Sequence, residues 1–196
     1  MVTIRLATPG DASELAEIYA PFVANKPTSF EEVTPSAADM AERVRETLAS
    51  YPYLVASEPG GVLGFAYASA HRTRASYRFS VDVSVYIRDT ARRRGFGRAL
   101  YVSLFELLRW QGYCAAHAGI TLPNVASVRL HEACGFRLIG VYPRVGFKLG
   151  AWHDVGWWQH ELRDRDGSPA EPRALAELAR DADFEARLLA GTRLQR

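Results

Sequence analysis

Hydrophobic and polar positions alternate along the first 162 residues with periods that change between those of strands and helices. Cap and turn residues such as Ser36 and Gly112 separate the periodic segments. The predicted elements are a strand at 3–6, helices through 15–22 and from 36 to about 48, strands at 53–57, 62–70 and 81–87, a helix from 97 to about 112, a strand at 114–120, a helix at 124–133, and strands at about 136–145 and 155–162. This order predicts a mixed α/β sheet flanked by helices.

The pattern changes after residue 162. Residues 163–169 form a polar segment, and Leu175, Leu178 and Ala179 then return at helical spacing, which favours a terminal helix extending to about Leu189. We therefore expect one domain at 1–162, and a polar linker with a helical tail at 163–196. The tail either caps the domain, lies at a dimer interface or lacks fixed structure.

Composition excludes several classes of protein. The chain of 196 residues is 48% hydrophobic and 23% charged, as in ordinary globular domains, and its net charge of +2 is too small to indicate a nucleic-acid partner. No apolar run approaches the ~20 residues that span a bilayer, so no membrane association is expected. Cys114 and Cys134 have no metal-ligand spacing, and we expect free thiols in the cytoplasm.

The candidate chemistry begins at the strand at 81–87. Its odd positions are valine and isoleucine, while Asp82, Ser84 and Tyr86 share the other face. A loop with three consecutive arginines and two glycines, Gly95 and Gly97, then leads directly into a long amphipathic helix. Glycines let the backbone approach a ligand, and the free amides at a helix start favour phosphate. The segment predicts a phosphate site, although such turns are often structural.

Two motifs carry a resemblance to a known family. Arg92-x-x-Gly95-x-Gly97 resembles the acetyl-CoA signature of the GCN5-related N-acetyltransferases (GNAT), and the block from Asn124 to Phe136 resembles the helix and strand that follow it. The resemblance implies the GNAT fold, a mixed central sheet splayed at the acetyl-CoA site, and acetyl-CoA as donor without a metal. The implied cofactor-binding residues are Val83, Val85, Tyr86, Ile87, Arg92, Arg93, Arg94, Gly95, Phe96, Gly97, Arg98, Asn124 and Ser127.

A narrower resemblance lies in the segment from Gly146 to Gln159, which is similar to the closing block of phosphinothricin and methionine sulfoximine or sulfone N-acetyltransferases. It implies direct transfer of acetyl to the α-amino group of a small amino acid, in a homodimer. The implied substrate-binding residues are Phe30, Arg72, Arg74 and Tyr77, which supply an aromatic cover, guanidinium and phenol groups for an anionic acceptor. A solvated arginine-rich loop is the alternative.

Three residues are catalytic candidates. Asp82 stands where the resembled family has a glutamate base; alternatively, Asp82 pairs with Arg74 or Arg78, and such an arginine would lower its pKa. His131 occupies the place of a tyrosine that protonates the departing thiolate in many members of the superfamily, or it is structural. His153 either orients the base or the amine, or is structural.

Two other functions remain open from the sequence. One is an acetyltransferase acting on peptide or protein amines, which would need an open groove. The other is a non-catalytic acyl-CoA-binding sensor, suggested by the aspartate at position 82. Trp157 and Trp158 lie in the core or at a dimer face, and His117 and His160 are expected to be structural.

Overall fold

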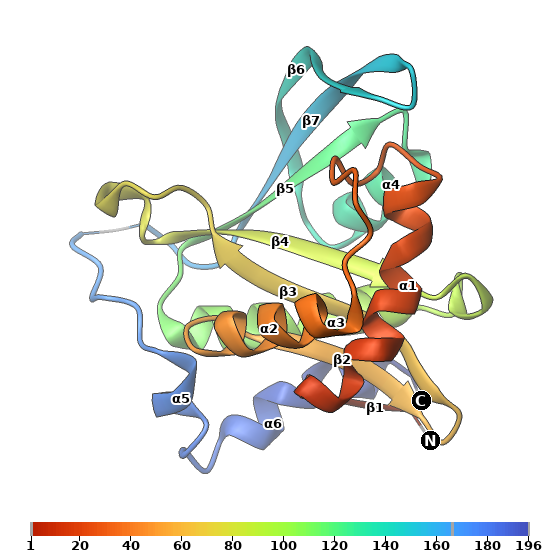
Figure 1. Cartoon of the computed structure of the whole chain (residues 1–196). Helices are drawn as coiled ribbons and strands as arrows, with labels where there is room; N and C mark the ends of the chain where they lie inside the picture. Colours follow the sequence, from red (N-terminus) through yellow and green to blue (C-terminus); the bar gives the residue numbers. More distant parts are fainter. Residues whose placement is uncertain (1, 166, 196) are drawn as a thin grey trace.

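The computed structural model describes residues 2–165 and 167–195, and of residue 195 only the backbone, so Met1, Arg196 and Asp166 of the predicted linker lie outside it. The helices and strands are β1 (Thr3–Leu6), α1 (Ala12–Ala24), α2 (Ala37–Leu48), β2 (Tyr53–Glu58), β3 (Gly61–Ala70), β4 (Ser80–Ile87), α3 (Phe96–Gln111), β5 (Ala115–Leu122), α4 (Val125–Ala133), β6 (Arg137–Lys148), β7 (Ala151–Glu161), α5 (Leu175–Leu178) and α6 (Phe184–Leu188). The predicted mixed sheet with flanking helices is confirmed (Figure 1).

The sheet has seven strands in the order β1-β2-β3-β4-β5-β7-β6, and only the β4–β5 pair is parallel. These two strands pair only from Ser80 to Asp82, opposite Ala115 to His117, and then diverge (Figure 1). This divergence, or splay, leaves the backbone of β4 beyond Asp82 without a strand partner on the side that faces β5. A bound ligand can take the place of the missing strand.

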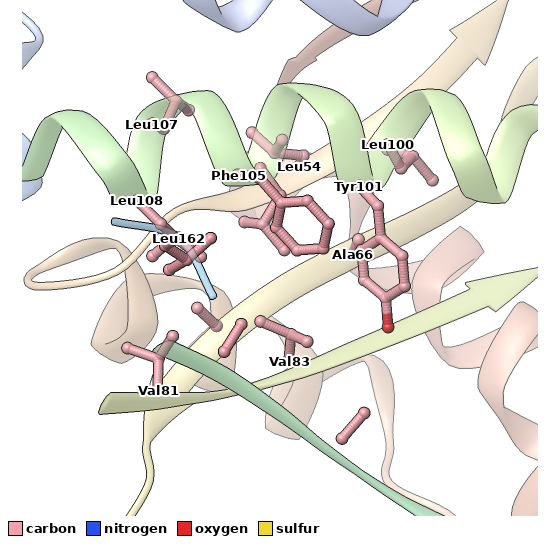
Figure 2. Packing of buried hydrophobic residues seen from close by; sticks show 14 of the residues in the cluster. Leu54, Ala66, Val81, Val83, Leu100, Tyr101, Phe105, Leu107, Leu108 and Leu162 are labelled. Carbon is pink, nitrogen blue, oxygen red and sulfur yellow. The ribbon is translucent and has the colours of Figure 1, made fainter. Parts of the chain in front are cut away.

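Helices cover both faces of the sheet. On one face, α3 packs its leucines, Tyr101 and Phe105 onto Leu54, Ala66, Val81 and Val83, as Figure 2 shows. On the other, α1 and α2 bury Leu15 and Met40 against Phe65. Alternate residues of β2 and β3 thus serve two hydrophobic cores, which explains why these two strands are nearly continuously apolar.

Local sequence signals set the helix limits. Ser36 accepts from the Asp39 amide at 3.2 Å, and Asp39 accepts from the Ser36 amide at 2.8 Å, which closes a capping box at the start of α2. Gly112, with φ of 108°, ends α3 in the left-handed conformation. Among the described residues, no helix has both the length and the apolar character needed to cross a membrane.

One region differs from its prediction. We expected a loop at 146–154, but β6 and β7 form a long hairpin whose turn is Leu149 and Gly150. Gly146 and Gly150 resemble loop residues in the sequence. In the structure Gly150 has φ of 78°, as a tight turn requires, and Gly146 lies where a Cβ would be 2.2 Å from the Phe30 ring.

The tail also differs from the single helix predicted. It forms α5, α6 and a final 3-10 turn, of which α6 and the 3-10 turn pack along α3 (blue in Figure 1). Gly191 donates its amide to Ser103 Oγ at 3.0 Å, and Gln111 Nε2 donates to the Arg173 carbonyl at 2.9 Å. Of the three alternatives, the described part of the tail takes the first and caps the domain.

Candidate active site

The arginine-glycine loop forms one wall of a cleft between β4, α3 and α4. Gly95 adopts the left-handed conformation with φ of 85°, which turns the chain from the loop into α3. The amides of the first turn of α3 have no carbonyl partner within the helix and point into this region. The cleft has a volume of about 460 Å³ and is lined by Phe22, Lys26, Thr28, Val85, Tyr86, Ile87, Ala91, Arg92, Arg93, Gly95, Phe96, Gly97, Arg98, Asn124, Ala126, Ser127 and Leu130.

Eleven of the thirteen predicted cofactor residues therefore line one cavity, and the other two do not. Arg94 lies 3.6 Å from Glu58 and over the Phe96 ring, so its charge interacts with the end of β2 instead of the cleft. Val83 lines a smaller cavity at the inner end of the cleft. The sequence missed Phe22, Lys26 and Thr28, because they come from α1 and the segment after it, far along the chain.

The inner end of the cleft lies in the splay, where a cavity of about 50 Å³ is bordered by Ser84, Gly119 and His131. His131 is buried, and burial lowers its pKa, so the ring is neutral. Its Nδ1 lies 2.8 Å from the Ser127 carbonyl, which can only accept, so Nε2 accepts from the Tyr101 hydroxyl at 2.8 Å. These contacts favour a structural role for His131 over thiolate protonation.

Asp82 lies at the last β4–β5 pair, immediately before the splay. Its Oδ1 is 2.6 Å from His71 Nδ1, and its Oδ2 is 4.0 Å from Arg72 Nη1. Among the described residues Asp82 makes no ion pair with Arg74 or Arg78, the predicted alternative, and Arg78 pairs instead with Glu171 of the tail at 2.7 Å.

The pKa of Asp82 also departs from expectation. We expected a neighbouring arginine to lower it, but burial raises it, outweighing the opposing hydrogen bond from His71 and the charge of Arg72. The carboxylate is partly removed from water, and its position on the sheet side of His71 accounts for this. A raised pKa makes the carboxylate a better proton acceptor.

Three of the four predicted substrate residues lie together. Arg72, Arg74 and Tyr77 line a cavity of about 350 Å³, to which the tail contributes Glu171 and Pro172. Phe30 is elsewhere, against Gly146 of the hairpin and with its ring centroid 6.5 Å from that of His153. The structure thus supports one arginine-tyrosine cavity and a separate aromatic contact between the Phe30 segment and the hairpin.

The segment that carries Phe30 is fixed by a buried lysine. Lys148 Nζ donates to the carbonyls of Val23, Ser29 and Glu31 at 2.6, 2.5 and 2.7 Å. Its three protons are thereby all used, and Lys148 is only 6% exposed. The sequence analysis counted Lys148 only as part of a motif. The available signal was its rarity, since this arginine-rich chain has just two lysines.

Further polar contacts hold the same segment to α1 and α2. Tyr19 hydroxyl lies 2.7 Å from Ser29 Oγ and donates to Glu31 at 2.9 Å. Arg43 makes a bidentate pair with Glu31, both distances being 2.8 Å. The hydrogen bond from Arg43 lowers the pKa of Glu31. The segment is therefore positioned by three separate elements.

His153 has a local contact instead of one at Asp82. Its Nε2 donates to the Lys148 carbonyl at 3.0 Å, across the hairpin turn. Among the described residues His153 makes no hydrogen bond to Asp82, which supports its structural alternative.

Sequence reasoning missed two residues at Asp82. His71 was not among the candidates, and His117 was expected to be structural. Their rings stack with centroids 4.2 Å apart. Burial, and then the charge of His71, lower the pKa of His117 to about 4. The signal that could have found His117 is its place on β5, opposite Asp82 in the register.

The remaining predictions about single residues have mixed outcomes. Trp158 is in the core, whereas Trp157 lies under the Arg72 guanidinium at 5.3 Å. Cys114 and Cys134 are free thiols, as predicted, although only Cys114 is fully buried. Within residues 2–165 and 167–195, no group of three or more His, Cys, Asp or Glu side chains is arranged to hold a metal ion.

A cleft at a β4–β5 splay, beside a glycine turn and a helix N-terminus, defines the class of acyl-CoA-dependent transferases. The Acetyltransferase (GNAT) domain family matches residues 4–157, and the chain belongs to this family. It is 38% identical over 175 residues to phosphinothricin N-acetyltransferase of Streptomyces viridochromogenes, covering 88% of this chain and 92% of that protein.

A second relative and a solved structure show the same similarity. The L-methionine sulfoximine/L-methionine sulfone acetyltransferase of Salmonella typhimurium is 33% identical, over 86% of this chain and 98% of that protein. The crystal structure of a phosphinothricin acetyltransferase from Sinorhizobium meliloti in complex with AcCoA has a TM-score of 0.82 and 38% identity, and covers 87% of this chain and 94% of that one. The resemblance stated from the sequence is confirmed at the level of the family.

Proposed function

We propose that this protein transfers acetyl from acetyl-CoA to the α-amino group of a small amino acid with an anionic or strongly polar head, of the phosphinothricin or methionine sulfone and sulfoximine kind. One observation carries the proposal. The half-buried carboxylate of Asp82 lies between the cofactor cleft and the cavity of Arg72, Arg74 and Tyr77. The relatives named for these acceptors support the substrate class.

The cleft fits acetyl-CoA, which when bound supplies a thioester acetyl group for an amine to attack. Amides of the first turn of α3, with Arg92, Arg93 and Arg98 on the rim, would hold the pyrophosphate. The unpaired backbone of β4 from Val83 to Ile87 would hydrogen-bond the extended arm of the cofactor. Gly97 allows close approach, because a Cβ there would meet Leu130 at 2.9 Å.

At the acceptor end, the guanidinium groups of Arg72 and Arg74 would bind the carboxylate and head-group oxygens, with Tyr77 as a hydroxyl donor. The amine must lose a proton before it can attack, and Asp82 provides the negative charge that draws this proton. The Phe30 segment, held by Lys148, borders the inner end of the cofactor cleft through Thr28, and it would cover the bound amino acid from there rather than from the arginine-tyrosine cavity.

An acceptor screen with detection of the released CoA thiol tests this function. We expect turnover with phosphinothricin, methionine sulfone or methionine sulfoximine, and none with peptides that carry the same residue at an internal position. Turnover only with peptides or proteins would establish the second candidate function. Acetyl-CoA binding without turnover of any amine would establish the sensor.

We also propose that the protein is a homodimer. Strand β6 is at the edge of the sheet, and it exposes apolar side chains on both of its faces: Leu138, Ile139, Val141, Tyr142, Val145 and Phe147 are each 43% exposed or more. An exposed apolar edge strand favours association with a second copy. Sedimentation should give twice the monomer mass, and Ile139→Lys should reduce it. For location we propose the cytoplasm, in keeping with the free thiols.

A further inference from the structure

His71 is placed where a general base has to be. Its side chain is 13% exposed, directly follows β3, and lines the arginine-tyrosine cavity, whereas Asp82 on β4, at 29% exposed, is not among the residues that line this cavity. Ser80, Asp82 and Ser84 share one face of β4. Ser80 borders the arginine-tyrosine cavity and Ser84 borders the inner end of the cofactor cleft, so the His71–Asp82 pair lies between the two.

The hydrogen bond fixes the tautomer of the ring. Asp82 accepts from His71 Nδ1 at 2.6 Å, so in the neutral imidazole Nε2 carries the free electron pair. Among the described residues, Nε2 has no hydrogen-bond partner. Stacking on His117 and the edge of Trp157 hold the ring in this orientation, with centroids 4.2 and 6.0 Å away.

We infer that His71 is the catalytic base of this enzyme, and that Asp82 is the positioning residue that orients it. The inference rests on the proposed function and deepens it. The aspartate is one methylene shorter than the glutamate of the resembled family, and the imidazole restores the missing reach.

The two protons that the substrate nitrogen loses in this reaction can both be accounted for. His71 Nε2 takes one proton from the substrate ammonium and passes it to solvent, while Asp82 stabilises the imidazolium. The amine lone pair then forms the C–N bond at the thioester carbonyl, and the C–S bond breaks. The nitrogen loses its second proton in this step, and the departing sulfur leaves as the thiol with one proton.

The charged and titratable groups around the ring are Asp82 on β4, Arg72 beside it, Tyr77 on the adjacent turn and His117 on β5. The low pKa of His117 keeps this second ring neutral at working pH, so it does not compete as a cation. Arg72 is 4.0 Å from the carboxylate, and its charge is thereby partly balanced.

His71→Asn is the decisive substitution, because the asparagine amide can still donate to Asp82 but has nothing at the position of Nε2. We expect kcat/KM to fall by ~10²-fold or more, the acid limb of its pH profile to change, and the Kd for acetyl-CoA to stay within about threefold. His160→Asn is the matched control, since that imidazole packs on Phe105 away from the site. Turnover of His71→Asn within about threefold of wild type, with the same pH profile, would overturn the inference.

A second measurement needs neither turnover nor a stable variant. Nitrogen-15 NMR of the wild-type protein should show neutral His71 protonated at Nδ1 and unprotonated at Nε2. The opposite tautomer would overturn the inference. The acceptor screen tests the proposed function independently: that function fails if the wild-type protein acetylates none of the amino acids. The tautomer measured by NMR still decides whether His71 is arranged as a base.

Discussion

The donor end and the acceptor end of the site are built in different ways. The donor end is one continuous segment, residues 92–98, completed by the start of α4, and most of what it offers is backbone. The acceptor end combines side chains from β3, β4, β5, the Phe30 segment, the hairpin and the tail. A backbone site can be recognised from a short motif, whereas a side-chain site depends on contacts between distant segments.

The difference also concerns tolerance to change. Amides of a helix start are supplied by almost any sequence, provided that glycine is kept where the backbone turns. At the acceptor end the positions of Asp82 and of the Phe30 segment depend on specific partners, which are His71 and the buried Lys148. Exchange of a single partner there leaves a buried group unsatisfied.

Gly97→Val should produce the largest effect at the donor end. The new side chain would meet Leu130 and narrow the phosphate site, and we expect the Kd for acetyl-CoA, measured by calorimetry, to rise ~10–100-fold, as loss of one or two hydrogen bonds to a charged group implies. Gly60→Val is the control, because Gly60 has open space around it. If both variants bind acetyl-CoA like the wild type, the donor end does not depend on this backbone approach.

Lys148→Met should affect the acceptor end more than the donor end. It leaves three buried carbonyls without their donor, at a cost of about 1–3 kcal/mol each if they stay dry. We expect the acceptor KM to rise ~10-fold, as a change of about 1.4 kcal/mol implies, with a smaller change in the Kd for acetyl-CoA. Arg45→Met, on the exposed side of α2, is the control. An unchanged acceptor KM would show that the Phe30 segment does not contribute to substrate binding.

The smallest effect expected is on stability against acid. His117 has its pKa lowered to about 4 in the folded state, so between about pH 6.5 and 4 the unfolded chain binds a proton that the folded protein does not. Stability is therefore present above the unfolded pKa and is lost as pH falls. Urea unfolding at pH 7.5 and 4.5 should show about 2 kcal/mol less loss in His117→Asn than in wild type. An equal loss in both would mean that His117 is charged in the folded protein.

The sequence was sufficient for most of the strands, for the helices of the first 133 residues and for the donor end. Periodicity and caps are local features of the sequence. The Arg92 to Gly97 segment keeps its geometry because it connects β4 directly to α3. The hairpin was not predictable, because its glycines serve a register shift and a ring contact with Phe30 that only the tertiary structure shows.

The acceptor end was only partly predictable. Arg72, Arg74 and Tyr77 are close in sequence, were predicted together and line one cavity. The partner of Asp82 did not, because it is set by which residue of the β3–β4 connection reaches over the sheet, and this residue is His71 rather than an arginine. Lys148 was missed for the same reason, since its three acceptors are more than 100 residues away in the chain.

The tail has a consequence beyond the stability of α3. Nearly the full length of the Salmonella relative aligns with only 86% of this chain, while the tail of this chain contributes Glu171 and Pro172 to the arginine-tyrosine cavity. The Arg78–Glu171 ion pair fastens that wall to the turn that bears Tyr77. On the proposed function this wall limits the size of the acceptor, so a change in the tail would alter selectivity without altering a residue of the catalytic sheet.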